Sequence, residues 1–423
     1  MPAHQILAPA GSFECLAAAI NAGAHAVYFG LDRLNMRSLS SKSFTAADLP
    51  EIARRCRTAG VEACMTINSL IYDEELPVVR DQISAAKSAG IDAVIAADAA
   101  VLLAAREAGI SAHLSTQLNI GNIEALAFYS QFADVVVLAR ELTLEQIAAI
   151  HAEARRRDLR GPAGEPIRIE AFCHGALCMA VSGKCYLSTH TKNSSANRGA
   201  CLQNCRRTYR LVDAERGIEL DVDGQRFLSP KDLKTIELMD KMCAAGISVF
   251  KIEGRARSPE YVFETVRCYR EALELAMSGR WSEESASRLP DWNERLARVF
   301  NRGFWTGWYM GAETMARTDA YGSSASTKKV YAGKVLNYFA KSGIAYVKLE
   351  AAGLEPNDSL MVIGPTTGVV TCTLGEFAVE DPQTGAMTPA AAHEPAPKGA
   401  AVTFRLSEKV RPGDKLYRIA AAR

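Results

Sequence analysis

The sequence predicts an α/β fold: a TIM-like (β/α)8 barrel that carries a cysteine-rich insert, followed by a small all-β barrel. Eight short apolar runs rich in strand-forming residues recur over the first 255 residues, and segments with helical periodicity separate them. Strands that alternate with helices form parallel sheets, and eight such units in about 250 residues match a closed barrel. A doubly wound open sheet is the alternative that the same alternation allows.

The eight apolar runs define the predicted barrel strands. Helical patterns lie between them, for example at Phe13–Ala22, Ala46–Thr58 and Leu144–Arg156. Ala-Gly pairs such as Ala59-Gly60 stand where these helices should end, as expected for glycine C-caps. The predicted strands are Gln5–Pro9, Ala26–Gly30, Val61–Asn68, Ala93–Asp98, Ala112–Gln117, Val135–Arg140, Ile167–Cys173 and Ser248–Glu253.

The C-terminal part of the chain has a different pattern. Helical patterns continue at Pro259–Gly279 and Trp292–Phe300, and a polar segment over 323–329 is typical of a linker. Beyond it, short alternating runs separated by Gly, Pro, Asn and Asp predict a small β-barrel. We therefore predict a barrel domain over 1–322 and a second domain over 330–423. Its predicted strands are Val330–Asn337, Ala345–Glu350, Ser359–Ile363, Val369–Leu374, Ala401–Leu406 and Lys415–Ile419.

The cysteine-rich insert is predicted at 176–229, between the seventh and eighth strands. It carries Cys178, Cys185, Cys201 and Cys205 in the spacing C-x6-C-x15-C-x3-C. Four thiolates that converge can hold zinc or an iron–sulfur cluster. The spacing lacks the close pairs of structural zinc sites, and by itself it leaves a cluster, zinc and unrelated buried thiols open. Because the insert follows the carboxyl end of a strand, we expect its metal centre over the barrel mouth, where this fold places active sites.

Composition and charge exclude some classes of function. The net charge is +1, so the whole chain has no strong attraction to nucleic acid, although residues 155–210 hold eleven Lys or Arg against three Asp or Glu. Such a patch attracts phosphates or is simply a solvated face. No apolar run is long enough to span a membrane. The N-terminus does not resemble a secretory signal, so we expect a cytoplasmic protein whose reduced cysteines favour metal binding over disulfides.

The segment around the first two cysteines resembles a known family motif. It has the pattern Glu170-x-Phe172-x-x-Gly175-Ala176-Leu177-Cys178-x4-Gly183-x-Cys185-x-Leu187-Ser188, which resembles the defining motif of the U32 family, historically called collagenase-like peptidases. The resemblance covers roughly residues 5–280, and all four cysteine positions are intact. It extends to Leu7-Ala-Pro-Ala-Gly11, His25-Ala-Val-Tyr-Phe-Gly30, Val137-Leu-Ala-Arg-Glu141, Ser195-Ala-Asn-Arg-Gly199 and Lys251-Ile-Glu-Gly-Arg255.

The resemblance implies RNA hydroxylation rather than proteolysis as the main function. Better-understood members resemble oxygen-independent hydroxylases, or their partners, that hold a [4Fe–4S] cluster on four cysteines. One group takes part in 5-hydroxyuridine formation at the tRNA wobble position with prephenate as the hydroxyl donor, another hydroxylates a cytidine of 23S rRNA, and a third modifies ubiquinone precursors. The length and the single β domain are most similar to the tRNA group. The implied partners are tRNA or rRNA and prephenate or a related donor, while a protein partner or homo-oligomer is left open.

Polar residues at or just past the predicted strand ends are the candidates for the rest of the site. A prephenate-like dicarboxylate requires fixed cations, and arginine binds carboxylates in a bidentate manner. Other polar groups there can position a base or move protons. For each residue, a structural hydrogen bond or ion pair at the barrel mouth is the alternative role. The substrate-binding candidates are Asn68, Gln117, Arg140, Glu141, Lys251 and Arg255, and the catalytic candidates are His174 and Glu253.

Two other classes of function compete with this hypothesis. A peptidase needs a nucleophile–base set, and neither G-x-S-x-G nor H-E-x-x-H occurs in the sequence. Cys173 and His174 are neighbours on a predicted strand, so their side chains should point to opposite faces, and Cys173 is expected in the core. The third class is a non-catalytic RNA-binding or scaffold protein with structural zinc.

Overall fold

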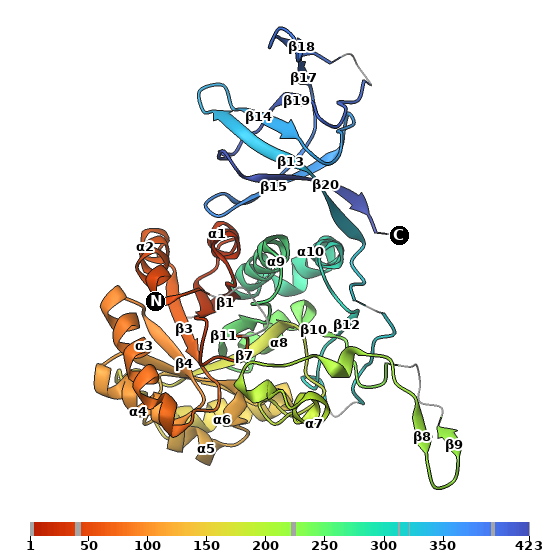
Figure 1. Ribbon diagram of the computed structural model, residues 1–423. Helices are drawn as coiled ribbons and strands as arrows, with labels where there is room; N and C mark the ends of the chain where they lie inside the picture. The colour runs from red at the N-terminus through yellow and green to blue at the C-terminus, as the bar shows by residue number, and fades with distance from the viewer. Residues whose placement is uncertain are drawn as a thin grey trace.

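The barrel is a closed sheet of eight parallel strands. In a computed structural model, which describes residues 4–38, 44–220, 226–311, 314–320, 322–390 and 394–422, each strand from β1 to β7 pairs with the next one along the chain. The eighth strand, β11, pairs in parallel with both β7 and β1 and closes the ring (Figure 1). The strands are β1 (Gln5–Pro9), β2 (Ala26–Gly30), β3 (Glu62–Ile67), β4 (Ala93–Ala96), β5 (Ser111–Leu114), β6 (Val135–Val137), β7 (Arg168–Gly175) and β11 (Ile247–Ile252). The prediction of a TIM-like barrel is confirmed, and the open-sheet alternative is wrong.

Helices surround the sheet, and glycines end several of them as predicted. Gly60, Gly90 and Gly109 are C-caps in the left-handed region, with φ of 67°, 81° and 62°, a conformation that costs glycine little. The helices are α1 (Phe13–Asn21), α2 (Leu49–Ala59), α3 (Leu76–Ala89), α4 (Ala99–Ala108), α5 (Ile123–Tyr129), α6 (Leu144–Arg156), α8 (Met239–Ala244) and α9 (Pro259–Met277). None of the helices in the described ranges combines the length and apolar character needed to cross a lipid bilayer.

One helix is longer than predicted. Helix α10 covers Trp281–Arg298, whereas the sequence predicts it only from Trp292. The sequence pattern stops at Pro290, because proline usually breaks a helix. In the structure the helix continues through Pro290, and Trp281 stacks on the buried Trp292 with ring centroids 6.3 Å apart. The helix therefore extends past the proline, and the two rings pack together from either side of it.

The segment between β7 and β11 holds the cysteines and rejoins the barrel through a short strand. It contains α7 (Leu187–Lys192), two 3₁₀ turns (Ala196–Arg198 and Asn204–Arg206) and a hairpin of β8 (Leu211–Asp213) and β9 (Ile218–Leu220) that projects from the molecule (Figure 1). Strand β10 (Asp232–Lys234) then pairs antiparallel with β7 and parallel with β12 (Phe304–Trp305). The sequence predicted neither β10 nor β12, because two- and three-residue strands leave no periodic pattern.

The C-terminal part is an antiparallel sheet of eight strands around its own apolar core. All six predicted strands are present, and the short β17 and β18 were not predicted. Among the described residues the strand order runs from β16 to β18, and these two edge strands do not pair with each other. The predicted all-β fold is therefore confirmed, as a curved sheet. Its strands are β13 (Thr327–Phe339), β14 (Ile344–Leu349), β15 (Ser359–Gly364), β16 (Gly368–Thr373), β17 (Phe377–Glu380), β18 (Met387–Pro389), β19 (Ala401–Arg405) and β20 (Lys415–Ala421).

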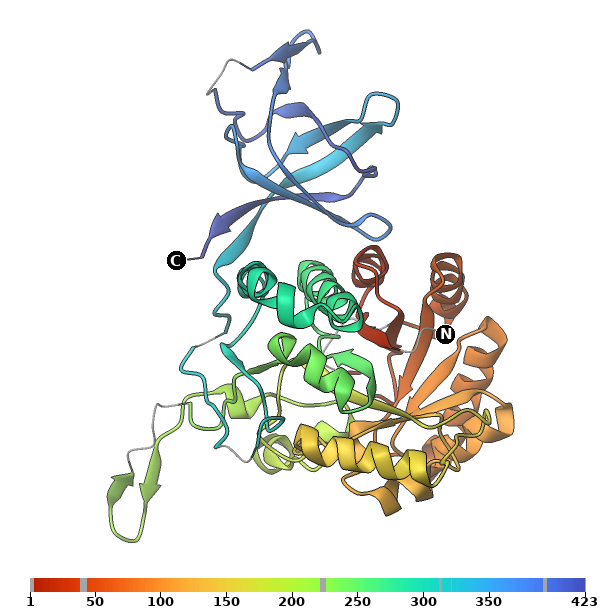
Figure 2. The same cartoon turned by 180° about the vertical axis from the view of Figure 1, so that it is seen from behind.

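The C-terminal sheet rests on the outer helices of the barrel. Its β15–β16 hairpin places Met361, Ile363 and Val369 against Ala18 of α1. The Asn21 side chain donates to the Thr367 carbonyl at 3.0 Å. Figure 2 shows the sheet over α1, α9 and α10, on the side of the molecule away from the β8–β9 hairpin. The cysteine segment and the β-domain therefore occupy different faces of the barrel.

Candidate cysteine-lined active site

A cavity of about 400 Å³ lies where the barrel strands end and the cysteine segment folds over them. Its walls include Tyr28 of β2, Thr66 of β3, Phe172 of β7 and Lys251 of β11, together with residues 176–183 of the cysteine segment. Active sites of this fold lie at the carboxyl ends of the strands. The cavity is therefore the candidate site.

All four predicted metal-ligating cysteines line this cavity. Cys178 follows β7 and is exposed, whereas Cys185, Cys201 and Cys205 are half-buried. Burial raises the pKa of Cys205, Arg206 opposes that shift, and the thiols of the other three cysteines raise the pKa further. That mutual influence requires the four sulfur atoms to lie near one another. Cys173, predicted as a core residue, is fully buried with Sγ 3.4 Å from the Lys251 carbonyl oxygen.

The spacing of the cysteine sulfurs does not outline a site for a single ion. In the described part of the chain, the one group of three or more metal-type ligand atoms within 4.8 Å of one another is elsewhere in the barrel. A tetrahedral zinc bound at about 2.3 Å brings its sulfur ligands to about 3.8 Å from each other. No three of the four cysteine sulfurs lie within 4.8 Å of one another, and four thiolates around one cavity are the ligand set that a four-iron cluster takes.

Cations dominate the rest of the cavity wall. Glu253 is the one carboxylate among the lining residues that the structure describes, against seven Lys or Arg side chains. Two further acids lie behind the wall, where Glu170 pairs with Lys251 at 2.6 Å and Asp232 with Arg302 at 3.3 Å. The remaining excess of positive charge favours an anionic ligand. The seven cations are Arg37, Arg140, Arg206, Lys251, Arg255, Arg257 and Arg302.

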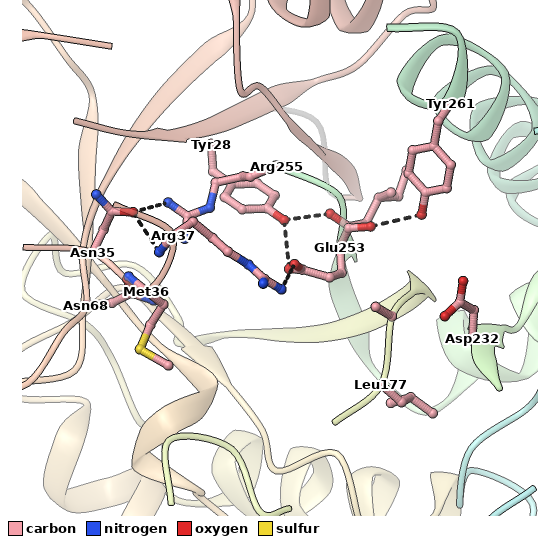
Figure 3. A network of polar contacts seen from close by, with 12 residues as sticks. Tyr28, Asn35, Met36, Arg37, Asn68, Leu177, Asp232, Glu253, Arg255 and Tyr261 are labelled. Carbon is pink, nitrogen blue, oxygen red and sulfur yellow. Dashed lines mark hydrogen bonds and ion pairs between the residues drawn. The ribbon is translucent and has the colours of Figure 1, made fainter. Parts of the chain in front are cut away.

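Glu253 is the centre of a charged network shown in Figure 3. Arg37 contacts its Oε1 at 3.1 Å, and the Tyr28 hydroxyl donates to its Oε2 at 3.3 Å. Burial alone would raise the pKa of Glu253, but the cations of Arg37, Arg140 and Arg255 outweigh burial and lower the pKa to about 2. Glu253 is therefore ionised at neutral pH, where it orients the surrounding cations and is available only as a base.

We expect Glu253 to make stability depend on pH. Because its folded pKa of about 2 lies below the ordinary 4.5, the ionised side chain stabilises the fold above pH 4.5 and loses this effect as the pH falls toward 2. Urea unfolding at several pH values should show that wild type exceeds Glu253→Gln in stability near neutrality and that the difference shrinks in this acid range. Glu376→Gln, which changes an exposed carboxylate, is the control. An equal difference at all pH values would contradict the prediction.

Three of the predicted substrate-binding cations are fixed by different contacts. Arg255 donates to Asn35 Oδ1 at 3.0 Å and Thr66 Oγ1 at 2.7 Å. The guanidinium of Arg140 lies 3.9 Å from the centre of the Phe172 ring, and Lys251 is held by its ion pair with Glu170. Side chains fixed in this way are preorganised to receive an anion.

An amide–hydroxyl chain lines another part of the wall. The Asn68 amide donates to Ser115 Oγ at 3.4 Å, and that hydroxyl donates to Gln117 Oε1 at 2.8 Å. Asn68 Oδ1 accepts from the Met36 backbone N–H at 3.3 Å. Both predicted amides therefore lie in the cavity, where their remaining donors and acceptors suit a polar ring such as a nucleobase.

Two glycines let the segment after β11 approach its neighbours. A methyl group at Gly11 would lie 1.9 Å from the Arg255 carbonyl oxygen, and one at Gly175, with φ of 106°, would lie 2.3 Å from the Glu253 carbonyl oxygen. Gly11→Ala should therefore displace the Arg255 backbone and cost about 1–3 kcal/mol of stability, as overpacking does. Urea unfolding measures this cost. Gly375→Ala, with nothing within 4 Å of its added methyl group, is the control and should unfold like wild type, and a similar loss in both would contradict the prediction.

Two predicted site residues lie outside the cavity. His174 is 1% exposed and is packed among Tyr261, Tyr269 and Phe304. Its Nδ1 lies 3.3 Å from the Tyr269 hydroxyl oxygen, and burial lowers its pKa to about 3, so it is neutral. Glu141 is exposed and does not line the cavity. The structure thus separates both residues from the cysteines, because His174 points from β7 toward the helices rather than into the barrel.

Several cations of the cavity were not predicted from the sequence. Arg37 lies in the loop after β2, and Arg257 and Arg302 lie after β11 and α10. The same rule about strand ends would have found Arg37 and Arg257 if it had included the loops as well as the strands. Arg302 had no such signal, because it reaches the cavity from a segment after the last barrel helix.

The predicted basic patch is partly neutralised. Arg157 pairs with Glu153 at 2.7 Å, and Arg198 pairs with Glu75 at 2.8 Å. Arg206 is half-buried and donates to the Leu177 carbonyl at 2.6 Å. The patch therefore does not carry an argument about nucleic acid by itself.

Comparison with known proteins supplies the family. A family model described as peptidase family U32 matches residues 11–319. A collagenase of Porphyromonas gingivalis is 51% identical over 98% of this chain and 97% of its own length. The tRNA hydroxylation protein P1 of Bacillus subtilis is 30% identical over 97% of this chain and 94% of its own length. A 23S rRNA 5-hydroxycytidine synthase of Escherichia coli is 34% identical over 67% of this chain and 41% of its own length. The chain belongs to the U32 family.

Proposed function

We propose that this protein takes part in the oxygen-independent hydroxylation of RNA, with 5-hydroxyuridine of tRNA as the product and a [4Fe–4S] cluster on Cys178, Cys185, Cys201 and Cys205. One observation carries the proposal: four thiols and seven cations line the same cavity at the mouth of the barrel. A relative named tRNA hydroxylation protein P1 and another named 23S rRNA 5-hydroxycytidine synthase support the reaction class.

The proposed reaction explains why a cofactor is needed. Hydroxylation of a pyrimidine carbon without oxygen requires redox chemistry that side chains do not supply, and an iron–sulfur cluster supplies one-electron steps when bound. Arg37 and Arg206 lie close enough for the cysteine thiols to affect their pKa values. Their positive charge offsets the negative charge of thiolates that ligate a cluster.

Three other cations that line the cavity fit the hydroxyl donor. Prephenate is a dicarboxylate, and Arg255, Arg140 and Lys251 lie in the wall with their side chains already fixed. Glu253 keeps Arg37 in place at 3.1 Å and is ionised. Asn68 and Gln117 are placed to hydrogen-bond a base that enters from the open side of the cavity.

The test combines cofactor analysis with nucleoside analysis. Protein purified without air should contain close to four iron and four sulfide per chain. A strain that lacks the gene should lose 5-hydroxyuridine-derived nucleosides from tRNA, and a plasmid copy should restore them. Unchanged tRNA nucleosides in a strain without a paralogue, grown without oxygen, would overturn the proposal; loss of 5-hydroxycytidine from 23S rRNA instead would redirect it to rRNA.

A peptidase is the second candidate, because a relative 51% identical carries the name collagenase. The geometry gives this reading little support. Cys173 Sγ contacts the Lys251 carbonyl oxygen, whereas His174 packs on Tyr269, so the two side chains do not form a nucleophile–base pair. Hydrolysis of gelatin by metal-free protein with all four cavity cysteines changed to Ser would favour the peptidase.

A further inference from the structure

A second group of metal-type side chains lies inside the barrel, away from the cavity. Glu62 and Cys64 belong to β3, and His113 belongs to β5. Glu62 is the first residue of its strand, and alternate residues of a strand share a face, so Glu62 and Cys64 point the same way. Cys64 packs with the other side chains of the barrel interior, such as Leu7 and Val135. The group therefore lies toward the amino ends of the strands, whereas the cavity lies at their carboxyl ends.

The three ligand atoms already have nearly the spacing of one coordination sphere. Glu62 Oε1 lies 3.6 Å from His113 Nε2 and 3.8 Å from Cys64 Sγ. One ligand atom from each residue lies within 4.8 Å of the others. Tetrahedral zinc, with bonds of about 2.0–2.3 Å, sets such atoms about 3.3–3.7 Å apart. Glu62 Oε1 therefore lies within a few tenths of an ångström of the required distance from each of the other two atoms, and the ligand atoms of His113 and Cys64 lie no more than 4.8 Å apart.

Burying these three side chains without a ligand costs free energy. Cys64 is 0% and His113 is 4% exposed, and His113 Nδ1 makes no hydrogen bond within the described structure. Burial raises the pKa of Glu62, raises that of Cys64 well above its ordinary value and lowers that of His113 to about 3. The imidazole is thus neutral, which is the form that binds metals. The ion would bind Nε2, which faces Glu62 at 3.6 Å, and the proton of the neutral ring would stay on Nδ1.

The surrounding charges permit a divalent cation. Arg168 and Lys251 face the group from the positive side, and Asp92 and Glu170 from the negative side. Arg168 is engaged with Gln5 Oε1 at 2.9 Å, and Lys251 with Glu170 at 2.6 Å. A divalent ion bound by one thiolate, one carboxylate and a neutral imidazole adds no net charge. The two nearby cations would therefore not face an excess positive charge.

We propose that Glu62, Cys64 and His113 bind one zinc-class divalent ion at the amino end of the barrel, with a fourth position left for water. Sulfur, nitrogen and oxygen ligands together suit zinc and cobalt rather than calcium or magnesium. The ion would tie β3 to β5 across the barrel interior. The proposal is independent of the RNA hydroxylation proposed above, since it concerns other residues and needs no substrate.

The test first removes the cavity cysteines, because they also bind zinc or cobalt. A full-length variant with Cys178, Cys185, Cys201 and Cys205 changed to Ser should still bind about one cobalt ion per chain and show a thiolate-to-cobalt charge-transfer band in the near ultraviolet. Adding Cys64→Ser should abolish the band, and adding His113→Ala should remove the ion. Gln5→Leu deletes the amide that donates to Glu62 at 3.4 Å and should weaken binding by about 10-fold, as loss of an outer hydrogen bond does.

Cys56→Ser, in a buried cysteine of α2, is the matched control and should leave the band unchanged. Added zinc should also raise the melting temperature of the four-serine variant but not of its Cys64→Ser derivative, which separates metal binding from misfolding. Absence of bound cobalt in the folded four-serine variant, or a band that survives Cys64→Ser, would overturn the proposal. Neither result bears on the iron content of wild type.

Discussion

Replacing Cys205 with Ser is expected to remove most of the bound iron and to lower the yield of hydroxylated nucleoside by at least about 100-fold. Loss of even an outer contact of a metal site costs about 10- to 100-fold, and this change deletes a proposed ligand. Cys205 is half-buried and its pKa is affected by the other three thiols, so it belongs to the same group of thiols. Iron analysis of anaerobically purified protein and mass spectrometry of tRNA nucleosides measure the two effects.

The matched control is Cys243→Ser, which changes a half-buried cysteine of α8 outside the cavity. It should keep the iron content and activity of wild type. If Cys205→Ser kept both as well, the four cysteines would not be the ligand set. The same experiment on Cys178, Cys185 and Cys201 should give the same large loss, because four thiolates act as one unit.

The second large effect is expected in stability. Glu170→Gln should destabilise the fold by about 3–5 kcal/mol, because it leaves a buried lysine without its counter-charge. Lys251 and Glu170 are 6% and 0% exposed and lie 2.6 Å apart. Urea unfolding followed by circular dichroism measures the loss. A change as small as that of Glu51→Gln, which breaks an exposed pair with Arg54, would contradict the prediction.

A double variant separates lost charge from lost packing. In Glu170→Leu with Lys251→Met, both charges disappear and the volumes are roughly kept, so much of the stability should return. Its activity should stay low if Lys251 binds the hydroxyl donor. Recovery of both stability and activity would assign Lys251 a structural role only.

The sequence was sufficient to predict the barrel and the position of the cysteines. Strands such as β1 and β2 were predicted residue by residue, because runs buried on both faces are apolar and bounded by glycine-capped helices. The cysteines, Arg140, Lys251 and Arg255 were found because this fold gathers strand ends at one mouth. That rule needs only the order of strands and loops along the chain, and this order can be read from the sequence.

Features that tertiary packing determines could not be predicted from the sequence. Arg37 reaches Glu253 from a loop whose path no periodicity describes. His174 lies beside the family motif, yet the alternation of β7 turns it toward Tyr269. Helix α10 runs through Pro290 because two tryptophans stack across that turn. The path of a loop and the packing of individual side chains decide these outcomes, and hydrophobic periodicity describes neither.

The two ends of the cysteine segment meet, and this has a consequence for the protein if it loses the proposed cluster. Gly175 and His174 of β7 pair with Leu233 and Lys234 of β10, and Arg206 donates to carbonyl oxygens near both ends, of Leu177 and of Pro230. The cysteine segment is therefore a loop whose two ends are held together by these contacts. Oxidation of its cysteine sulfurs should loosen this segment while the parallel strands of the barrel keep their hydrogen-exchange protection. A chain that has lost the proposed cluster would therefore stay folded and able to accept a new one.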